Sequence, residues 1–218
     1  MWFYEFFRLF GIILAYPLQL LFFKRKTYYV NKKTTNLKKG GKLIVSNHFN
    51  ALDYPNTLYM VFPRKLYAVT AEIPFRSRFL RFGMKFFGTI QANRVTRSMT
   101  FINESVKELR KEHLVQIFPE GRNSPDGNLQ PFFRSYVLIA HRANKPIVPI
   151  VSDGNYSFFK RASVIVGEEI NVSDFIDPNK RAPSKAEVLA VNDYVYQKVV
   201  ELRAELEERK KKKRRGEK

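Results

Sequence analysis

Short apolar runs alternate with longer helical stretches through the middle of this chain, and this alternation limits the fold more than any other feature. The runs with the length and composition of strands are residues 42–46, 66–70, 114–118, 147–152 and 163–166. Helices are expected at residues 55–60, 75–86, 98–111, 134–143 and 184–208. Such alternation predicts a single α/β domain, residues 27–208, in which helices flank a mixed, partly parallel sheet.

The first 23 residues are largely apolar, with Glu5 and Arg8 as their only charged side chains. The uninterrupted part, residues 9–23, would cover only about 22 Å as a helix, whereas the hydrocarbon core of a bilayer measures roughly 30 Å. A full span would need Glu5 and Arg8 at the interface. We expect residues 1–26 to form a hydrophobic, membrane-associating helix that lies in the interface or dips partway in.

The chain carries 39 Lys and Arg residues against 20 Asp and Glu residues, a formal net charge of +19. This excess favours a polyanionic partner, which could be nucleic acid, an anionic membrane or a phosphorylated substrate. Nucleic acid is disfavoured because the basic stretches form no recognisable reading motif. A second basic run, residues 209–215, predicts a disordered basic tail over residues 209–218.

Residues 24–42 contain basic side chains and no acidic ones, directly behind the apolar segment. This distribution favours contact of residues 24–42 with anionic head groups on the cytoplasmic face of a membrane. No small-residue cleavage site follows the apolar run, which argues against a secretory signal peptide. We therefore expect a membrane-associated protein at the cytoplasmic face.

The segment NHFNALD follows the first predicted strand and contains His48 and Asp53, with four residues between them. If the chain turns into a helix here, Asp53 can fold back onto one ring nitrogen of His48 and leave the other as a base. The chain has no cysteine, and Ser46 is the only serine nearby. His48 would therefore activate a hydroxyl that the substrate brings.

The segment FPEGRNS follows another predicted strand and carries Glu120, Gly121 and Arg122 in a turn-rich loop. Arginine binds phosphate through a bidentate fork, and glycine lets the backbone approach a ligand. A solvated ion pair in a Pro/Gly turn is the alternative interpretation. Two further segments, GTIQANR ending at Arg94 and VPIV around Pro149, are unremarkable when taken singly.

Together and in this order, NHFNALD, GTIQANR, FPEGRNS and VPIV resemble the motifs of the glycerolipid acyltransferase family, of the 1-acylglycerol-3-phosphate type. The resemblance implies that His48 is the general base and that Asp53 orients it. It also implies that Arg94 binds the acceptor phosphate, while Glu120 and Gly121 shape that site. The block that contains Pro149 would belong to the acyl-donor side and the core.

The third block departs from the family pattern, which usually reads Phe-Pro-Glu-Gly-Thr-Arg-Ser. Here Arg122 occupies the Thr position and Asn123 the Arg position. Either Arg122 reaches the phosphate from one residue earlier, or Arg94 and Arg134 carry the charge, or the acceptor differs from the usual phosphate.

The resemblance implies transfer of a fatty acyl group from a thioester on coenzyme A or acyl carrier protein to a lysophosphatidate-like acceptor, giving phosphatidate. Neither a metal nor a cofactor is expected, and His113 and His141 are expected in helix-end or surface roles. One alternative is an acyltransferase for another lysophospholipid or a polar alcohol. Another, of a different class, is a non-catalytic basic module on the membrane surface.

Overall fold

The computed structural model describes residues 2–14, 16–17, 24–71, 87–92, 99–124, 127–156 and 161–216. Within these ranges one sheet runs in the order β1-β7-β6-β2-β5-β3-β4. Its strands are β1 (Arg25–Tyr29), β2 (Lys42–Ser46), β3 (Leu66–Ala71), β4 (Thr89–Ala92), β5 (Leu114–Ile117), β6 (Ile147–Ser152) and β7 (Ala162–Val166). The predicted α/β class with a mixed sheet is confirmed.

Strand direction divides the sheet into two parts. Strands β6, β2, β5, β3 and β4 are parallel neighbours in that order, whereas β7 is antiparallel to β6 and β1 is parallel to β7. The carboxyl ends of the five parallel strands therefore share one edge of the sheet with the amino ends of β7 and β1. In α/β sheets, ligands bind beyond the carboxyl ends of the parallel strands.

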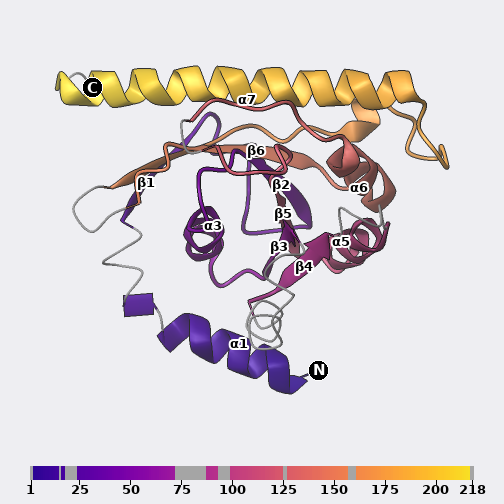
Figure 1. The fold of residues 1–218 in the computed structure, drawn as a ribbon, viewed down its shortest axis with the longest axis horizontal. Coiled ribbons are helices and arrows are strands. Elements are labelled where there is room, and N and C mark those ends of the chain that lie inside the picture. Colours follow the sequence, from indigo (N-terminus) through magenta and orange to yellow (C-terminus); the bar gives the residue numbers. More distant parts are fainter. Residues whose placement is uncertain are drawn as a thin grey trace.

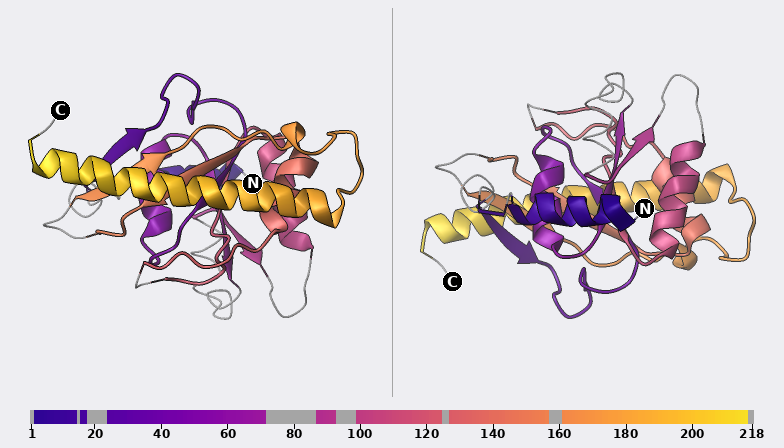
Figure 2. Two further views of the ribbon diagram at one scale, coloured as in Figure 1. Left: turned by 90° about the horizontal axis from the view of Figure 1, so that it is seen from above. Right: turned by 90° about the horizontal axis from the view of Figure 1, so that it is seen from below.

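Helices cover both faces of the sheet (Figure 1). They are α1 (Trp2–Leu14), α3 (Asp53–Val61), α5 (Thr100–Arg110), α6 (Ser135–Ala143) and α7 (Lys185–Arg214), with a short 3-10 turn at Val172–Asp174. Helix α7 lies along one face and α1 crosses beneath the opposite face, as the two views of Figure 2 show. The terminal helices are thus separated by the sheet.

The core has two layers because successive side chains of a strand point to opposite faces. In β2, Leu43 and Val45 pack in the layer that also holds the buried side chains of α5, α6 and α7. Ile44, between them, packs in the layer that holds Ile12 of α1 and Leu58 of α3. Burial on both faces explains why β2 is a continuous apolar run.

Most predicted elements are confirmed within a few residues at their ends, and two expectations need correction. Residues 25 and 26, assigned to the apolar segment, belong to edge strand β1, which pairs along β7. Helix α7 continues to Arg214, so the basic run predicted to be disordered from residue 209 is helical to that point. The predicted helix at residues 75–86 lies outside the described residues.

Helix α1 is docked on the domain by its arginine. Arg8 is 5% exposed, donates a hydrogen bond from Nη2 to the carbonyl oxygen of Leu66, and lies over the ring of Tyr67 at 4.8 Å. The full-span alternative required Arg8 at the bilayer interface, and the structure buries it instead. None of the described helices has the length and hydropathy that a crossing of the bilayer requires.

Candidate active site

The site is built where three strands of the sheet end. The loops that follow β2, β5 and β6 converge at this edge and carry His48, Glu120 and Tyr156. Asn47 links the loop after β2 to the end of β6. Its side-chain amide donates to the carbonyl oxygen of Ser152 and accepts from the Ser152 N–H, both at 3.0 Å. Loops from distant parts of the sequence are thereby held in one place.

His48 and Asp53 form the predicted pair. The Nδ1 atom of His48 lies 2.8 Å from Asp53 Oδ2. Because a carboxylate only accepts hydrogen bonds, Nδ1 carries the hydrogen and Nε2 keeps its lone pair. Within the described part of the chain Nε2 makes no hydrogen bond, and the His48 side chain is 19% exposed. The imidazole is therefore oriented as a base, with Nε2 unbonded among these residues.

Asp53 is held by more donors than the histidine alone. Its Oδ2 also accepts the backbone N–H groups of Phe49 at 2.7 Å and Asn50 at 2.8 Å, and its Oδ1 accepts the Tyr156 hydroxyl at 2.5 Å. Asp53 is only 3% exposed. Burying a carboxylate costs free energy unless its oxygens accept hydrogen bonds, and these four donors offset that cost. The turn before α3 thus supplies both the carboxylate and the amides that fix it.

The hydrogen bond from Tyr156 to Asp53 was not predicted from the sequence. Burial, together with the neighbouring Asp53 charge, raises the pKa of Tyr156, which keeps its hydroxyl protonated as a donor. The same hydroxyl lies 2.8 Å from Ser152 Oγ. Tyr156 is 103 residues from Asp53 in sequence, and no local pattern marks it.

Glu120 braces the backbone beside His48. Its Oε1 accepts the N–H of His48 at 3.0 Å and its Oε2 accepts the N–H of Gln130 at 2.9 Å. Burial raises the pKa of this carboxyl group. Since both oxygens are occupied by backbone donors, the geometry gives Glu120 a positioning role. Its predicted contact with substrate stays a prediction.

Gly121 and Arg122 complete the loop. Gly121 has φ of +67°, and a Cβ atom there would lie 2.6 Å from the ring of Phe133, so the position requires glycine. Arg122 is exposed and donates from Nη2 to Gln130 Oε1 at 2.5 Å. The guanidinium therefore lies at the rim of the loop, and its predicted phosphate contact stays a prediction.

Arg94 lies outside the described residues. The preceding strand, β4, ends at Ala92 on the edge of the sheet where the His48 loop also begins. Its predicted role as a phosphate ligand stays a prediction.

A small cavity beside His48 contains a basic side chain from the far end of the chain. Arg203 of α7 lines this cavity together with His48 and Glu120, and its charge acts on the Glu120 carboxylate. The spacing of apolar residues in α7 predicts which face of the helix packs on the sheet, but it does not predict which loop Arg203 contacts.

The ring of His48 is stacked on Phe118, with 4.1 Å between ring centroids.

Ser46 is not placed as a nucleophile. Its hydroxyl accepts a hydrogen bond from Gln116 Nε2 at 2.8 Å, and Gln116 also donates to Thr57 Oγ1 at 3.1 Å. Ser46 is 4% exposed. These groups form a buried polar layer beneath the loop. Ser124 lines the small cavity beside His48, and its hydroxyl donates to the carbonyl oxygen of Asn128, so both serine hydroxyls have partners other than the base.

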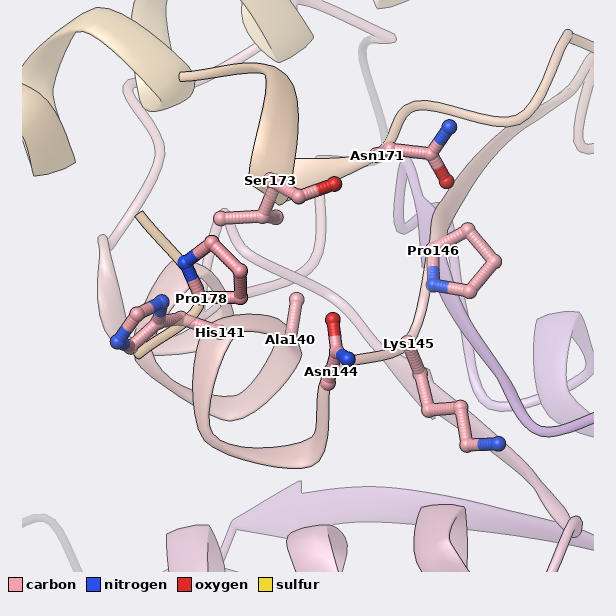
Figure 3. A pocket seen from close by; sticks show the side chains of 9 residues that line it. Ala140, His141, Asn144, Lys145, Pro146, Asn171, Ser173 and Pro178 are labelled. Atoms are coloured by element: carbon pink, nitrogen blue, oxygen red, sulfur yellow. The ribbon is translucent and has the colours of Figure 1, made fainter. Parts of the chain in front are cut away.

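The other two histidines lie away from this edge. His113 precedes β5 and contacts Glu108 through Nδ1 at 2.9 Å. His141, in the last turn of α6, contacts the carbonyl oxygen of Lys180 through Nε2 at 2.7 Å and borders the hollow drawn in Figure 3, near the start of β6. In the described ranges, no three His, Asp or Glu side chains converge as metal ligands would.

A His–Asp pair at the carboxyl edge of a mostly parallel sheet is the arrangement of an enzyme that uses a histidine as general base toward a hydroxyl. The profile of the Acyltransferase family matches residues 27–153, and the chain belongs to that family.

Relatives and a solved structure agree with this membership. The 1-acyl-sn-glycerol-3-phosphate acyltransferase of Bacillus subtilis (strain 168) is 25% identical over 174 residues, which cover 77% of this chain and 84% of that protein. The 1-acyl-sn-glycerol-3-phosphate acyltransferase beta of Homo sapiens is 31% identical over 121 residues, which cover 54% of this chain. The chain spans about half the length of its animal relatives, 48% for a Caenorhabditis elegans protein and 43% for the human one.

The crystal structure of the 1-acyl-sn-glycerophosphate acyltransferase PlsC from Thermotoga maritima has the same fold. It superposes with a TM-score of 0.59 over 85% of this chain and 73% of that chain, at 18% sequence identity.

Proposed function

We propose that this protein transfers a fatty acyl group from a thioester donor to the free hydroxyl of a 1-acylglycerol-3-phosphate, giving phosphatidate. The observation that carries the proposal is the His48–Asp53 pair, in which Nε2 makes no hydrogen bond within the described residues. The hydroxyls of Ser46 and Ser124 have partners other than this base. The relatives in Bacillus subtilis and Homo sapiens, which are 1-acyl-sn-glycerol-3-phosphate acyltransferases, support the choice of acceptor.

The reaction is a single displacement at the thioester carbonyl. His48 Nε2 takes the proton of the acceptor hydroxyl as that oxygen attacks the carbonyl carbon. The carbon–sulfur bond then breaks, and the imidazolium returns the proton to the departing thiolate. Asp53 stabilises the imidazolium at 2.8 Å, while Tyr156 and two backbone amides keep Asp53 in place.

Phosphate recognition is assigned to the basic side chains of the loops. Arg94 binds the acceptor phosphate in this proposal, with Arg122 at the rim and the loop of Glu120 and Gly121 shaping the opening. Arg203 adds a positive charge in the cavity beside His48. The donor is coenzyme A or acyl carrier protein, and the chemistry requires neither a metal nor a further cofactor.

The reaction takes place at a membrane surface, on the cytoplasmic face, with α1 as the contact. Helix α1 exposes a row of large apolar side chains: Phe6, Leu9, Phe10, Ile13 and Leu14. Exposed apolar area of this kind inserts favourably at the boundary between head groups and acyl chains. Both lipid substrate and product reside in that layer.

Replacement of the base tests the proposal. His48→Ala should lower acyl transfer to lysophosphatidate by about 10²- to 10⁴-fold, because general-base assistance is worth that much. His113→Ala, which removes a histidine away from the edge, is the matched control and should keep full turnover. Full turnover by His48→Ala, with folding confirmed by circular dichroism, would overturn the proposal.

Tyr156→Phe tests the support of the carboxylate. The change removes one donor to Asp53 and no atom of the base, so kcat should fall about tenfold, the cost of one hydrogen bond to a charged group. The KM for both substrates should stay unchanged. An unchanged kcat would show that the two backbone amides suffice to hold Asp53.

A second candidate acceptor is favoured by Asn123, which stands where the family pattern has arginine, and by the contact of Arg122 with Gln130. Both features weaken the case for a phosphate in this loop. Turnover measured against lysophosphatidate, other lysophospholipids and a neutral polar alcohol separates the candidates, since a strong preference for the neutral acceptor would favour the second.

A further inference from the structure

A second cavity, of about 420 Å³, lies at the same edge of the sheet as His48. It is bounded by the first residues of β1 and β7, the loop after β6 and the last turns of α7. Its basic lining side chains are Lys26, Arg161, Lys210 and Lys213, and Asp153 is its acidic one.

The charges around this cavity do not cancel. Lys210 is paired with Asp153 at 3.1 Å and with Glu207 at 2.8 Å. Although burial opposes it, hydrogen bonds from Ser163 and Asn155 and the contact with Lys210 lower the pKa of Asp153, so this carboxylate stays ionised near neutral pH.

The remaining three cations have no carboxylate partner within the described ranges. Lys26 contacts the ring of Tyr28, with its ammonium 4.6 Å from the centroid, and neither Arg161 nor Lys213 has an ion pair there. Three uncompensated positive charges around one cavity suit a ligand that carries several phosphate charges.

The sheet fixes how far this cavity lies from the catalytic pair. Strand β7 is two positions from β2 in the sheet, and β1 is three. At a spacing of about 4.7–4.9 Å between neighbouring strands, the amino ends of β7 and β1 lie roughly 10–15 Å from the end of β2.

Helix α7 gives the same separation independently. Arg203 lines the cavity beside His48, and Lys210 and Lys213 line the second cavity. At a rise of 1.5 Å per residue, these lysines lie about 10 and 15 Å along the helix from Arg203. The helix thus places basic side chains at both sites and spans the distance between them.

We propose that the second cavity binds the phosphates of a coenzyme A thioester, the acyl donor of the proposed function, on which this inference rests. Coenzyme A carries a diphosphate and a 3′-phosphate at one end and its thiol at the end of a long flexible arm. With the phosphates held by Lys26, Arg161 and Lys213, the arm follows α7 past Arg203 and brings the thioester to His48 Nε2.

A membrane lipid could supply phosphate too, but the placement of α1 favours a soluble ligand. Helix α1, which carries the exposed apolar side chains, lies on the opposite side of the sheet from α7 (Figures 1 and 2). A bilayer that receives α1 therefore leaves the last turns of α7 on the side away from it.

The test compares two double charge reversals on the full-length protein. Arg161→Glu with Lys213→Glu changes the cavity, whereas Lys211→Glu with Lys212→Glu makes the same charge change on exposed positions of α7 that do not line it. Binding of unacylated coenzyme A is measured by calorimetry at two salt concentrations, and binding to vesicles that contain phosphatidate is measured by sedimentation.

The cavity variant should bind coenzyme A at least about tenfold more weakly, and the control variant should bind it within twofold of the unmodified protein. In turnover assays the KM for the donor should rise, with kcat and the KM for the acceptor unchanged. Equal binding of coenzyme A by both variants would overturn the inference, as would a loss of vesicle binding confined to the cavity variant.

Failure of this inference is distinguishable from failure of the proposed function. Coenzyme A binding that depends on the cavity, without acyl transfer, would retain the site and refute the reaction. Acyl transfer with donor binding unaffected by the cavity variant would retain the reaction and refute the site.

Discussion

Helix α1 exposes its apolar side chains and buries an arginine, whereas α7 buries its apolar side chains and exposes lysines at its end. In α1, Phe10 is 54% exposed and Leu14 is 68% exposed, while Arg8 is 5% exposed. In α7, Val195 and Val199 are fully buried.

The contrast follows from what each helix packs against. Five aliphatic side chains of α7 recur every three or four residues and fill one layer of the core: Val191, Val195, Val199, Leu202 and Leu206. Helix α1 instead contributes Ile12 to the other layer, while Leu9, Phe10, Ile13 and Leu14 stay exposed. A helix with one regular apolar stripe becomes part of the domain, and a helix with apolar side chains beyond the side that it docks is left with area to bury elsewhere.

The largest effect should come from a charge placed in the stripe of α7. Val199→Asp buries a carboxylate without a partner and should lower the free energy of unfolding by about 4 kcal/mol. Val200→Asp makes the same change at a position that is 40% exposed and should cost less than about 1 kcal/mol. Urea denaturation measures both, and similar losses for the two variants would show that the stripe is not what holds α7.

A smaller effect is expected on the exposed face of α1. Phe10→Ser with Leu14→Ser removes apolar side chains worth about 1.5–3 kcal/mol each when fully transferred from water. Phe10 is 54% and Leu14 68% exposed, so roughly 2–4 kcal/mol is available, and binding to anionic vesicles should weaken by about one to three orders of magnitude. Phe175→Ser with Val200→Ser, exposed on the α7 side, is the control. Equal losses of vesicle binding would mean that the membrane does not distinguish the two sides.

The smallest effect is expected at the end of α7. Lys211→Ala with Lys212→Ala should change binding to anionic vesicles by less than about twofold, because charges beyond a screening length of 8–10 Å contribute little. Each lysine near an anionic surface is worth about 1 kcal/mol, so a drop of tenfold or more would place this end of α7 on the membrane.

Much of the sheet is predictable because a strand buried on both faces has a continuous apolar sequence. Strands β2 and β6 were predicted with the bounds that the structure has, as continuous apolar runs. Strand β1, RKTYY, escaped prediction because it is a half-buried edge strand that begins with two basic residues.

The end of α7 was wrongly predicted for a related reason. Lysine and arginine are good helix formers, and Arg209 and Lys210 pair with Glu205 and Glu207 along the helix. Lys210 is also fixed to Asp153 of the sheet edge. A run of like charges read as a solvated tail therefore continues the helix.

The contacts of the candidate site likewise divide into local ones that the sequence predicts and long-range ones that it does not. The contact between His48 and Asp53 was predictable, because five residues of chain and one turn bring the two side chains together. Tyr156, Glu120 and Arg203 reach the pair from three other elements, and only one of them lies in a segment that the sequence analysis singled out.

By itself the sequence determined the class of fold, the His–Asp pair and the family, since each depends on residues that are close in the chain. Only the tertiary structure decided that Tyr156 donates to Asp53, that α1 and α7 lie on opposite faces, and that the basic end of α7 meets the start of β1. These contacts join residues that are more than 100 positions apart, and strand order, which no local pattern encodes, is what brings them together.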